Sequence, residues 1–261
     1  MLRPRSDGRQ NLLNFTMNIT PAPAGQSEGL DAEGNTFTQI WFNGLWNKLE
    51  ISTISQAEIN RSNPFDYLLT PQMIRLPLSF DQSTRFLLKP YLFRSTVHTH
   101  LEDAAAELGQ SLVEKASYQT VAVLDSLNTY LHSNLKRTQR EEPGILAPEA
   151  TLAEGQGACR DLASLFVDVC RSLGIPARFV SGYHAGDSTS KEWELHAWAE
   201  IYLPGAGWRG YDPTLGLAVG DRHVALAASY DPHRTTPVAG SFRGTGIAAH
   251  FETRIEIEDA I

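Results

Sequence analysis

Cys159, His196 and Asp212 have the side-chain types that nucleophilic catalysis at a carbonyl carbon requires. In such a set a thiolate attacks the carbonyl carbon, a histidine takes the thiol proton, and a carboxylate holds the imidazole in one tautomer. The chemistry to expect is acyl transfer or hydrolysis through a thioester. The three residues are far apart in the sequence, so the elements that carry them must bring them together.

A helix is predicted to begin at Cys159. Its apolar residues recur at steps of three and four, and they are Leu162, Leu165, Phe166, Val169, Cys170 and Leu173. Gly174 is a natural C-terminal cap, and Pro176 prevents continuation. Unpaired N–H groups and the helix dipole stabilise a thiolate at the first position, so Cys159 is the predicted nucleophile. Cys170 lies on the apolar stripe and is predicted to be an inert buried thiol.

The segment around His196 has the period of a strand. The even-numbered positions are mostly polar or aromatic: Glu192, Glu194, His196, Trp198, Glu200 and Tyr202. The odd-numbered positions form a second, apolar set: Trp193, Leu195, Ala197, Ala199, Ile201 and Leu203. The second set is predicted to face the core and the first to be the open face. His196 is therefore predicted on the open, polar face, where it can act as a base.

A hairpin is expected to place Asp212 beside this strand. A four-residue loop that pairs Leu203 with Trp208 would turn Asp212 toward the core. A three-residue loop that pairs Leu203 with Gly207 puts Asp212 opposite Trp198, on the same face as His196. If Asp212 orients the imidazole, the loop must have an odd length or contain a bulge.

Several other residues are candidates for supporting the site. The backbone N–H of Cys159 is one predicted oxyanion donor, and Gln156 is a second candidate. Asp161 is interpreted as a first-turn acid that complements the helix dipole, with modulation of the thiolate as the alternative. Trp198 is expected either to line a substrate cleft or to pack in the sheet, and Tyr183 ends a strand from which it could reach the site.

The rest of the chain predicts two regions of different period. Residues 1–75 read as a β-rich domain with alternation in 13–19 and strand candidates at 37–42 and 49–59, which suggests a small sandwich. Residues 76–100 are a connecting segment. Helical spacing begins at Leu101, and a long functional loop is expected from Thr138 to Gly157. Residues 101–247 form the expected core, and residues 248–261 are expected to be a closing strand that returns to the β domain.

Composition and charge limit the classes of function. The 261 residues are 42% hydrophobic and 20% charged, which describes a globular protein rather than a disordered one. The formal net charge is −8, and the largest basic group is Lys136, Arg137 and Arg140, so no nucleic-acid partner is expected. The sequence shows no secretory signal and no membrane span, and two cysteines exclude a disulfide framework, so a reducing cytoplasm is expected.

No cofactor or metal is expected from the sequence. The histidines His98, His100, His132 and His184 lack zinc spacing with cysteine or acidic partners, and no calcium-loop spacing is present. A zinc hydrolase is kept only as a distinct alternative that elemental analysis would test. The oligomeric state is not predicted.

Four motifs resemble the bacterial transglutaminase-like superfamily. They are Gly157-Ala-Cys-Arg-Asp161 at the start of a helix, the segment 174–183, His196-Ala-Trp-Ala-Glu200, and Gly207-Trp-Arg-Gly-Tyr-Asp-Pro-Thr214. Leu2-Arg-Pro-Arg5, Gln10, Asp31 with Gly34-Asn35, and Asn63-Pro-Phe65 are similar to the β-rich region that precedes this core in many bacterial members. The segments 223–227, 230–231 and 237–240 are similar to its C-terminal continuation.

The resemblance implies an α+β fold in which a papain-like transglutaminase core follows a β-sandwich-like N-terminal domain. By motif position it implies Cys159 as nucleophile, His196 as base and Asp212 as orienting carboxylate. The implied function is cysteine-dependent acyl chemistry on an amide of a protein or peptide, with hydrolysis favoured. A true crosslinking transglutaminase and a non-catalytic protein-binding module are the alternatives. The sequence departs from the family by starting at the Leu2 block, which another strand usually precedes, and by its segment 227–231.

Overall fold

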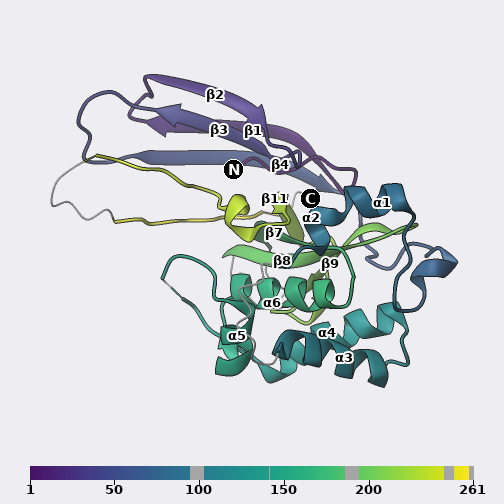
Figure 1. Ribbon diagram of the computed structural model, residues 1–261. Coiled ribbons are helices and arrows are strands. Elements are labelled where there is room, and N and C mark those ends of the chain that lie inside the picture. Colours follow the sequence, from purple (N-terminus) through teal and green to yellow (C-terminus); the bar gives the residue numbers. More distant parts are fainter. Residues whose placement is uncertain (95–102, 141, 186–193, 244–249, 259–261) are drawn as a thin grey trace.

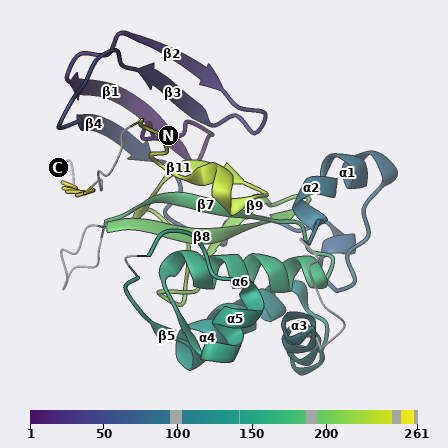
Figure 2. The same ribbon diagram turned by 60° about the vertical axis from the view of Figure 1, so that its left-hand side comes forward.

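The computed structural model describes residues 1–94, 103–140, 142–185, 194–243 and 250–258. The chain is arranged in three layers, which are clearest in Figure 2. The N-terminal strands form one outer layer, a five-stranded sheet lies in the middle, and helices cover the other side (Figure 1). This α+β architecture is the predicted fold class.

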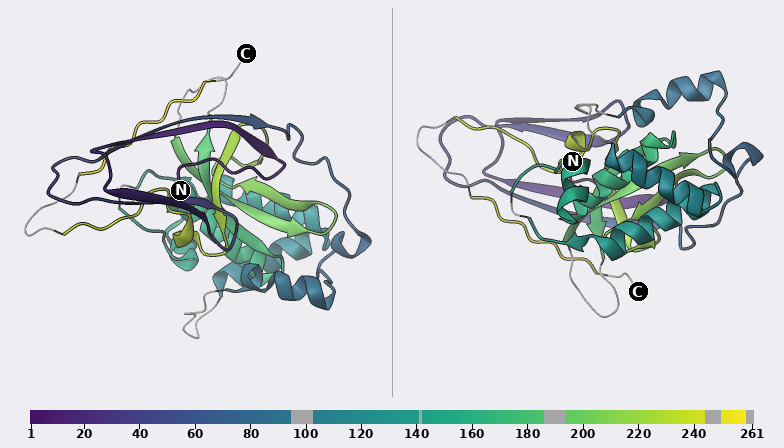
Figure 3. Two further views of the ribbon diagram at one scale, coloured as in Figure 1. Left: turned by 90° about the horizontal axis from the view of Figure 1, so that it is seen from above. Right: turned by 60° about the horizontal axis from the view of Figure 1, so that its bottom comes forward.

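The N-terminal layer consists of two antiparallel pairs of strands. β1 (Gln10–Thr20) pairs with β4 (Glu50–Ile59), and β2 (Gly25–Leu30) pairs with β3 (Thr36–Trp41). Seen from above, these strands lie across the middle sheet (Figure 3). The period-two segments of the first sixty residues are therefore strands, as predicted.

The middle sheet is antiparallel and has the strand order β10-β9-β8-β7-β11. Its strands are β7 (Ala177–His184), β8 (Glu194–Leu203), β9 (Gly207–Asp212), β10 (Leu217–Ala218) and β11 (His223–Ser229). β8 and β9 form the expected hairpin. Leu203 pairs with Gly207, so the loop has three residues, and Gly205 and Gly207 take the positive φ angles of 92° and 70° that favour glycine. The prediction of an odd-length loop is confirmed.

The helical layer buries one face of this sheet. α3 (Ala104–Lys115), α4 (Thr120–Asn134), α5 (Pro148–Glu154) and α6 (Cys159–Ser172) make up most of it. Leu165 and Phe166 of α6 are fully buried in one apolar core with Ile201 of β8. α6 ends as predicted, because Gly174 has a φ of 72° and the Ile175 N–H donates to the Cys170 carbonyl at 2.9 Å.

Several elements differ from the sequence prediction. The expected loop from Thr138 to Gly157 contains α5, which begins at Pro148 and is closed by Gly155 in the left-handed conformation. The connecting segment contains two short helices, α1 (Gln82–Leu87) and α2 (Lys89–Leu92). The closing-strand prediction is wrong for residues 250–258, which form no strand; residues 248–249 and 259–261 of that segment lie outside the described residues. In the described part of the chain, no helix has the length and apolarity needed to cross a bilayer.

Candidate active site

Cys159 is the first residue of α6, and its thiol is half-buried. The thiol packs against a small apolar cluster of Ala163, Phe179 and Ala197. Ala197 directly follows His196 in β8, so the N-terminus of α6 lies at the end of the sheet where His196 is found. The nucleophile is thus placed at a helix N-terminus, where the dipole favours an anion.

Asp161 organises the entry to this helix. Its side chain is completely buried and accepts the N–H groups of Ala158 at 2.9 Å and Leu146 at 2.8 Å. Its carboxylate also forms an ion pair with Arg140 at 3.0 Å. These contacts agree with the interpretation as a first-turn acid. They also bind the segment around residues 140–146 to the start of α6, next to Cys159.

His196 and Asp212 are in direct contact. The imidazole Nε2 lies 2.7 Å from Asp212 Oδ2, and both side chains are fully buried. The other carboxylate oxygen accepts the N–H groups of Thr214 at 2.9 Å and Leu215 at 3.2 Å. Burial raises the pKa of Asp212, but hydrogen bonds from His196 and His223 outweigh burial and hold this pKa well below its ordinary value. Asp212 is therefore a carboxylate at neutral pH.

His223 is a functional candidate that the sequence analysis did not find. Its Nε2 lies 3.0 Å from the same Asp212 Oδ2 that binds His196. His223 comes from β11, on the far side of β7 from β8, and only the sheet order brings it here. The signal in the sequence was the position of His223 in a block that resembles the family, but no role followed from that position.

The face of β8 that carries His196 is buried, so its prediction as an open face is wrong. Trp198 and Glu200 are 1% and 0% exposed. The N-terminal layer covers them, because Arg9 forms an ion pair with the Glu200 carboxylate from one side and Arg178 does so at 2.6 Å from the other. Burial raises the pKa of Glu200, but these two arginines bring it to about 2. A polar face can be buried when each charge is paired in this way.

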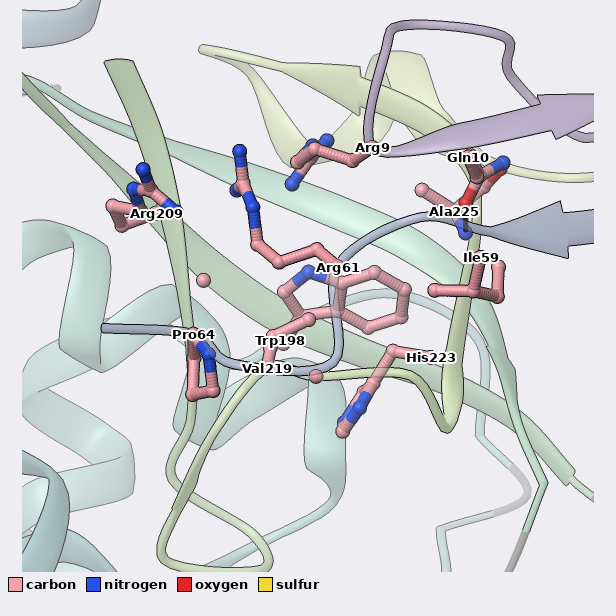
Figure 4. Close-up of a pocket in the computed structure, with 12 residues that line it drawn as sticks. Arg9, Gln10, Ile59, Arg61, Pro64, Trp198, Arg209, Val219, His223 and Ala225 are labelled. Atoms are coloured by element: carbon pink, nitrogen blue, oxygen red, sulfur yellow. Dashed lines mark hydrogen bonds between the residues drawn. The ribbon is translucent and has the colours of Figure 1, made fainter. Parts of the chain in front are cut away.

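Figure 4 shows the contact between the two layers at this face. Trp198 and His223 of the sheet lie across a pocket from Arg9 and Arg61 of the N-terminal region. The enclosed space is about 20 Å³, which is room for about one water molecule. This pocket is too small for a peptide.

The structure brings His196 and Asp212 together, and it places Cys159 at the same end of the sheet. The alternation of β8 turns Ala197, a member of the cluster that Cys159 packs against, to the α6 side and His196 to the opposite side. Among the residues that the structure describes, no hydrogen bond joins the thiol to the imidazole. Catalytic hydrogen bonds are often long in enzymes without substrate, so this geometry is compatible with a triad.

The remaining candidates take different positions. Trp198 is in the core, where its ring lies 5.1 Å from that of His223, so it packs in the sheet beside the small pocket of Figure 4. Tyr183 pairs with Leu195 and is half-buried on the α6 side; burial raises the pKa of its hydroxyl. Gln156 is exposed and pairs through its backbone with Lys136. A contact with substrate remains a prediction for Tyr183 and Gln156.

A divalent metal has one candidate position among the described residues. His196, Asp212 and His223 bring three ligand atoms within 4.8 Å of one another. Two histidines and one carboxylate are ligands that zinc accepts. The sequence analysis did not predict this group, because it compared spacing along the chain and the three residues come from three strands. The histidine–aspartate hydrogen bonds already satisfy the same atoms. His132 contacts the Thr214 carbonyl at 3.0 Å, and His98 and His100 lie outside the described residues.

The fold and the site together define a class of α+β protein with a cysteine at the start of a central helix and a histidine–aspartate pair on the adjoining sheet. Family comparison gives this class its name. Residues 106–213 match the transglutaminase-like superfamily, and residues 1–58 match the bacterial transglutaminase-like N-terminal region. By these two matches the chain belongs to the transglutaminase-like superfamily, and its first 58 residues are a bacterial transglutaminase-like N-terminal region.

Three relatives illustrate the range of similarity. An uncharacterised protein of Mycobacterium leprae is 24% identical over 98% of this chain and 89% of its own length. A protein-glutamine gamma-glutamyltransferase of Pseudomonas aeruginosa is 35% identical over 89 residues, which are 28% of this chain and 13% of that protein. A solved structure from Cytophaga hutchinsonii, described as a candidate cysteine protease, has a TM-score of 0.64 and 20% identity over 89% of this chain and 75% of that one. The last similarity shows the fold.

Proposed function

We propose that the protein is a cysteine-dependent hydrolase or acyl transferase that acts on an amide of a protein or peptide. Cys159 is the nucleophile, His196 the general base and acid, and Asp212 the residue that orients His196. The observation that carries the proposal is the buried 2.7 Å contact between His196 Nε2 and an ionised Asp212, at the end of the sheet where α6 presents Cys159. Such a pair is what a thiol nucleophile needs beside it.

Acylation follows from these roles. Because Asp212 holds Nε2, the nitrogen that exchanges protons with the thiol is Nδ1 of His196. Nδ1 takes the proton of Cys159, and the thiolate sulfur bonds to the amide carbon. The carbon–nitrogen bond then breaks, the imidazolium proton passes to the leaving nitrogen, and ammonia or an amine departs. The backbone N–H of Cys159 is the proposed donor to the oxyanion formed on the way.

Deacylation returns the enzyme to its starting state. Nδ1 takes a proton from water, the water oxygen bonds to the thioester carbon, and the carbon–sulfur bond breaks. The sulfur leaves as thiolate and takes the proton back from Nδ1, so the thiol and the neutral imidazole are restored and the product is a carboxylic acid. Cys159 is half-buried rather than enclosed, which supports water as the acceptor. With an amine as acceptor the same steps give a new amide, and the P. aeruginosa relative named as a glutamyltransferase supports this second candidate.

Activity assays on two substrate types test the proposal. Glutamine-containing peptides are followed for ammonia release and for chain cleavage by mass spectrometry, with and without an added alkylamine. We expect hydrolysis by the wild type and none by Cys159→Ala. Cys170→Ala is the matched control. The Cys170 thiol is completely buried, so this variant should retain the activity. Amine incorporation that exceeds hydrolysis would favour crosslinking, and equal turnover by wild type and Cys159→Ala would contradict the proposal.

A further inference from the structure

We propose that His223 positions the catalytic pair, and that the N-terminal domain holds His223 in place through the side chain of Gln10. This inference rests on the proposed function, since it assigns a positioning role within the same site. It makes the N-terminal domain a part of the active site's framework, although the domain contributes no side chain to the triad.

The first step is the sharing of one carboxylate oxygen. Asp212 Oδ2 accepts from His196 at 2.7 Å and from His223 at 3.0 Å. Two donors on one oxygen fix the rotation of the carboxylate more closely than one donor does, and the backbone N–H groups of Thr214 and Leu215 fix its other oxygen. Asp212 therefore has four partners, and only His196 among them has a part in the chemistry.

The second step concerns the state of the His223 ring. Its Nδ1 is buried and has no hydrogen-bond partner, so Nε2 is the ring nitrogen through which His223 meets the carboxylate of Asp212. The ring is held edge-on between Trp198, with centroids 5.1 Å apart, and His184, with centroids 4.7 Å apart.

The third step is the attachment of β11 to the N-terminal domain. β11 is an edge strand of the sheet, and instead of another strand its outer edge meets two carboxamide side chains and the backbone N–H of Arg5, which donates to the Ala225 carbonyl at 2.9 Å. Gln10 accepts the Ala225 N–H and donates to the Ala225 carbonyl, both at 2.8 Å. Asn35 makes the same two contacts with Ala228, both at 2.9 Å. Covering an exposed edge in this way also protects it from other strands.

These contacts form a continuous path from the N-terminal domain to the base. Gln10 binds Ala225, and Ala225 lies two residues along β11 from His223. His223 binds Asp212, which binds His196. A shift of the domain would therefore move β11 and, through His223, the carboxylate that orients the imidazole. Gln10 is 3% exposed, so the contact between its carboxamide and Ala225 is buried.

Two amide substitutions of His223 distinguish a role in positioning Asp212 from a role in packing alone. In His223→Gln the amide nitrogen stands as many bonds from Cα as Nε2 does, so the donor to Asp212 is kept. In His223→Asn the amide nitrogen corresponds to Nδ1 and falls short of Asp212. We expect His223→Asn to lower kcat about 10-fold to 100-fold with little change in KM, and His223→Gln to restore most of the loss.

A spectroscopic measurement makes the test independent of turnover. In the wild type labelled with ¹⁵N-histidine, we expect two downfield N–H proton signals, from Nε2 of His196 and of His223. His223→Asn should remove one and shift the other. Gln10→Ala should shift both, whereas Gln56→Ala, an exposed amide of the same domain, should shift neither. Because these signals need no substrate, they distinguish failure of this inference from failure of the proposed function.

The proton signal of His196 and the kcat of the His223 variants decide whether the inference holds. An unchanged His196 signal in His223→Asn or, if that variant does not fold, in Gln10→Ala would overturn the inference. Equal loss of kcat in His223→Asn and His223→Gln would also overturn it, since a lost ring rather than a lost donor would be the cause. Rescue by Gln together with a Gln10→Ala shift would establish the path.

Discussion

The two faces of the middle sheet are both buried, but they are built from opposite kinds of side chain. On the α6 face, Ala199, Ile201 and Leu203 pack against leucines and Phe166 in one apolar core. On the other face of the same strand, His196, Trp198 and Glu200 lie beneath the N-terminal domain. One face is stabilised by burial of apolar surface, and on the other the buried carboxylates Glu200 and Asp212 are each paired with two side chains.

The comparison shows why catalysis is proposed for one face only. An apolar face can be repacked with modest consequences as long as volume is conserved. A buried polar face has no such freedom, because each unpaired group is a large penalty. The fixed hydrogen-bond geometry that this imposes is what a general base requires. Substitutions on the two faces should therefore separate stability from activity.

The largest effect is expected from Asp212→Asn. This change keeps the shape but replaces a double acceptor with an amide that presents N–H groups to His196 and His223. We expect kcat to fall about 10³–10⁴-fold, the size typical for loss of an orienting carboxylate, with KM changed far less. Steady-state kinetics on a substrate identified by the peptide assays measures both. Equal changes in kcat and KM would contradict an orienting role.

Glu200→Gln should mainly change stability and its dependence on pH. It leaves Arg9 and Arg178 buried without a full counter-charge, for a loss of about 3–5 kcal/mol at neutral pH. Glu200 has a folded-state pKa of about 2, below its ordinary value, so the wild type should lose this stabilisation as pH falls from about 4.5 toward 2. Denaturant titrations across this range should show a flatter dependence for the variant; parallel curves would contradict the assignment.

Leu165→Ala provides the matched experiment on the apolar face. Leu165 is fully buried, and its truncation should destabilise the protein by about 2–5 kcal/mol. At temperatures where the variant remains folded, kcat should stay within a few-fold of wild type. Thermal unfolding and kinetics on the same sample measure both quantities. A kcat loss as large as that of Asp212→Asn would mean that the two faces are not separable.

The smallest effect is expected from Asn35→Ala. It removes two hydrogen bonds to Ala228 and leaves an N–H and a carbonyl of β11 without partners, for a loss of about 1–3 kcal/mol. Because Ala228 lies farther along β11 than Ala225, the effect on kcat should be smaller than that of Gln10→Ala. Hydrogen exchange at the Ala228 amide should rise, and unchanged protection there would contradict the pairing.

The apolar face could be predicted from the sequence because periodicity reports it directly. The helix from Cys159, the hairpin and its three-residue loop followed from spacing, turn residues and the requirement that Asp212 meet His196. The burial of Glu200 could not be predicted, because its partner Arg9 is 191 residues away in the sequence. His223 was missed for the same reason, since neither pairing leaves a local pattern.

α5 was missed for a different reason. Its seven residues are too few for a clear apolar period, although Pro148 at its start and Gly155 at its end are the terminal signals of a helix. The closing tail shows the opposite error. Phe251, Thr253, Ile255 and Ile257 have the period of a strand, but the structure gives the described part of this segment no strand partner. Alternation of apolar residues predicts a strand only where the edge of a sheet is available for pairing.

The central claim is that Cys159 is the nucleophile activated by His196, and site-resolved alkylation tests it most directly. Iodoacetamide labelling of Cys159 and Cys170 is followed by mass spectrometry across pH in the wild type and in His196→Ala. We predict rapid modification of Cys159 at about pH 5–6 that His196→Ala slows, with Cys170 unreactive because burial raises the pKa of its thiol. Modification of Cys159 only as pH approaches about 8.5, with the same profile in His196→Ala, would contradict the account.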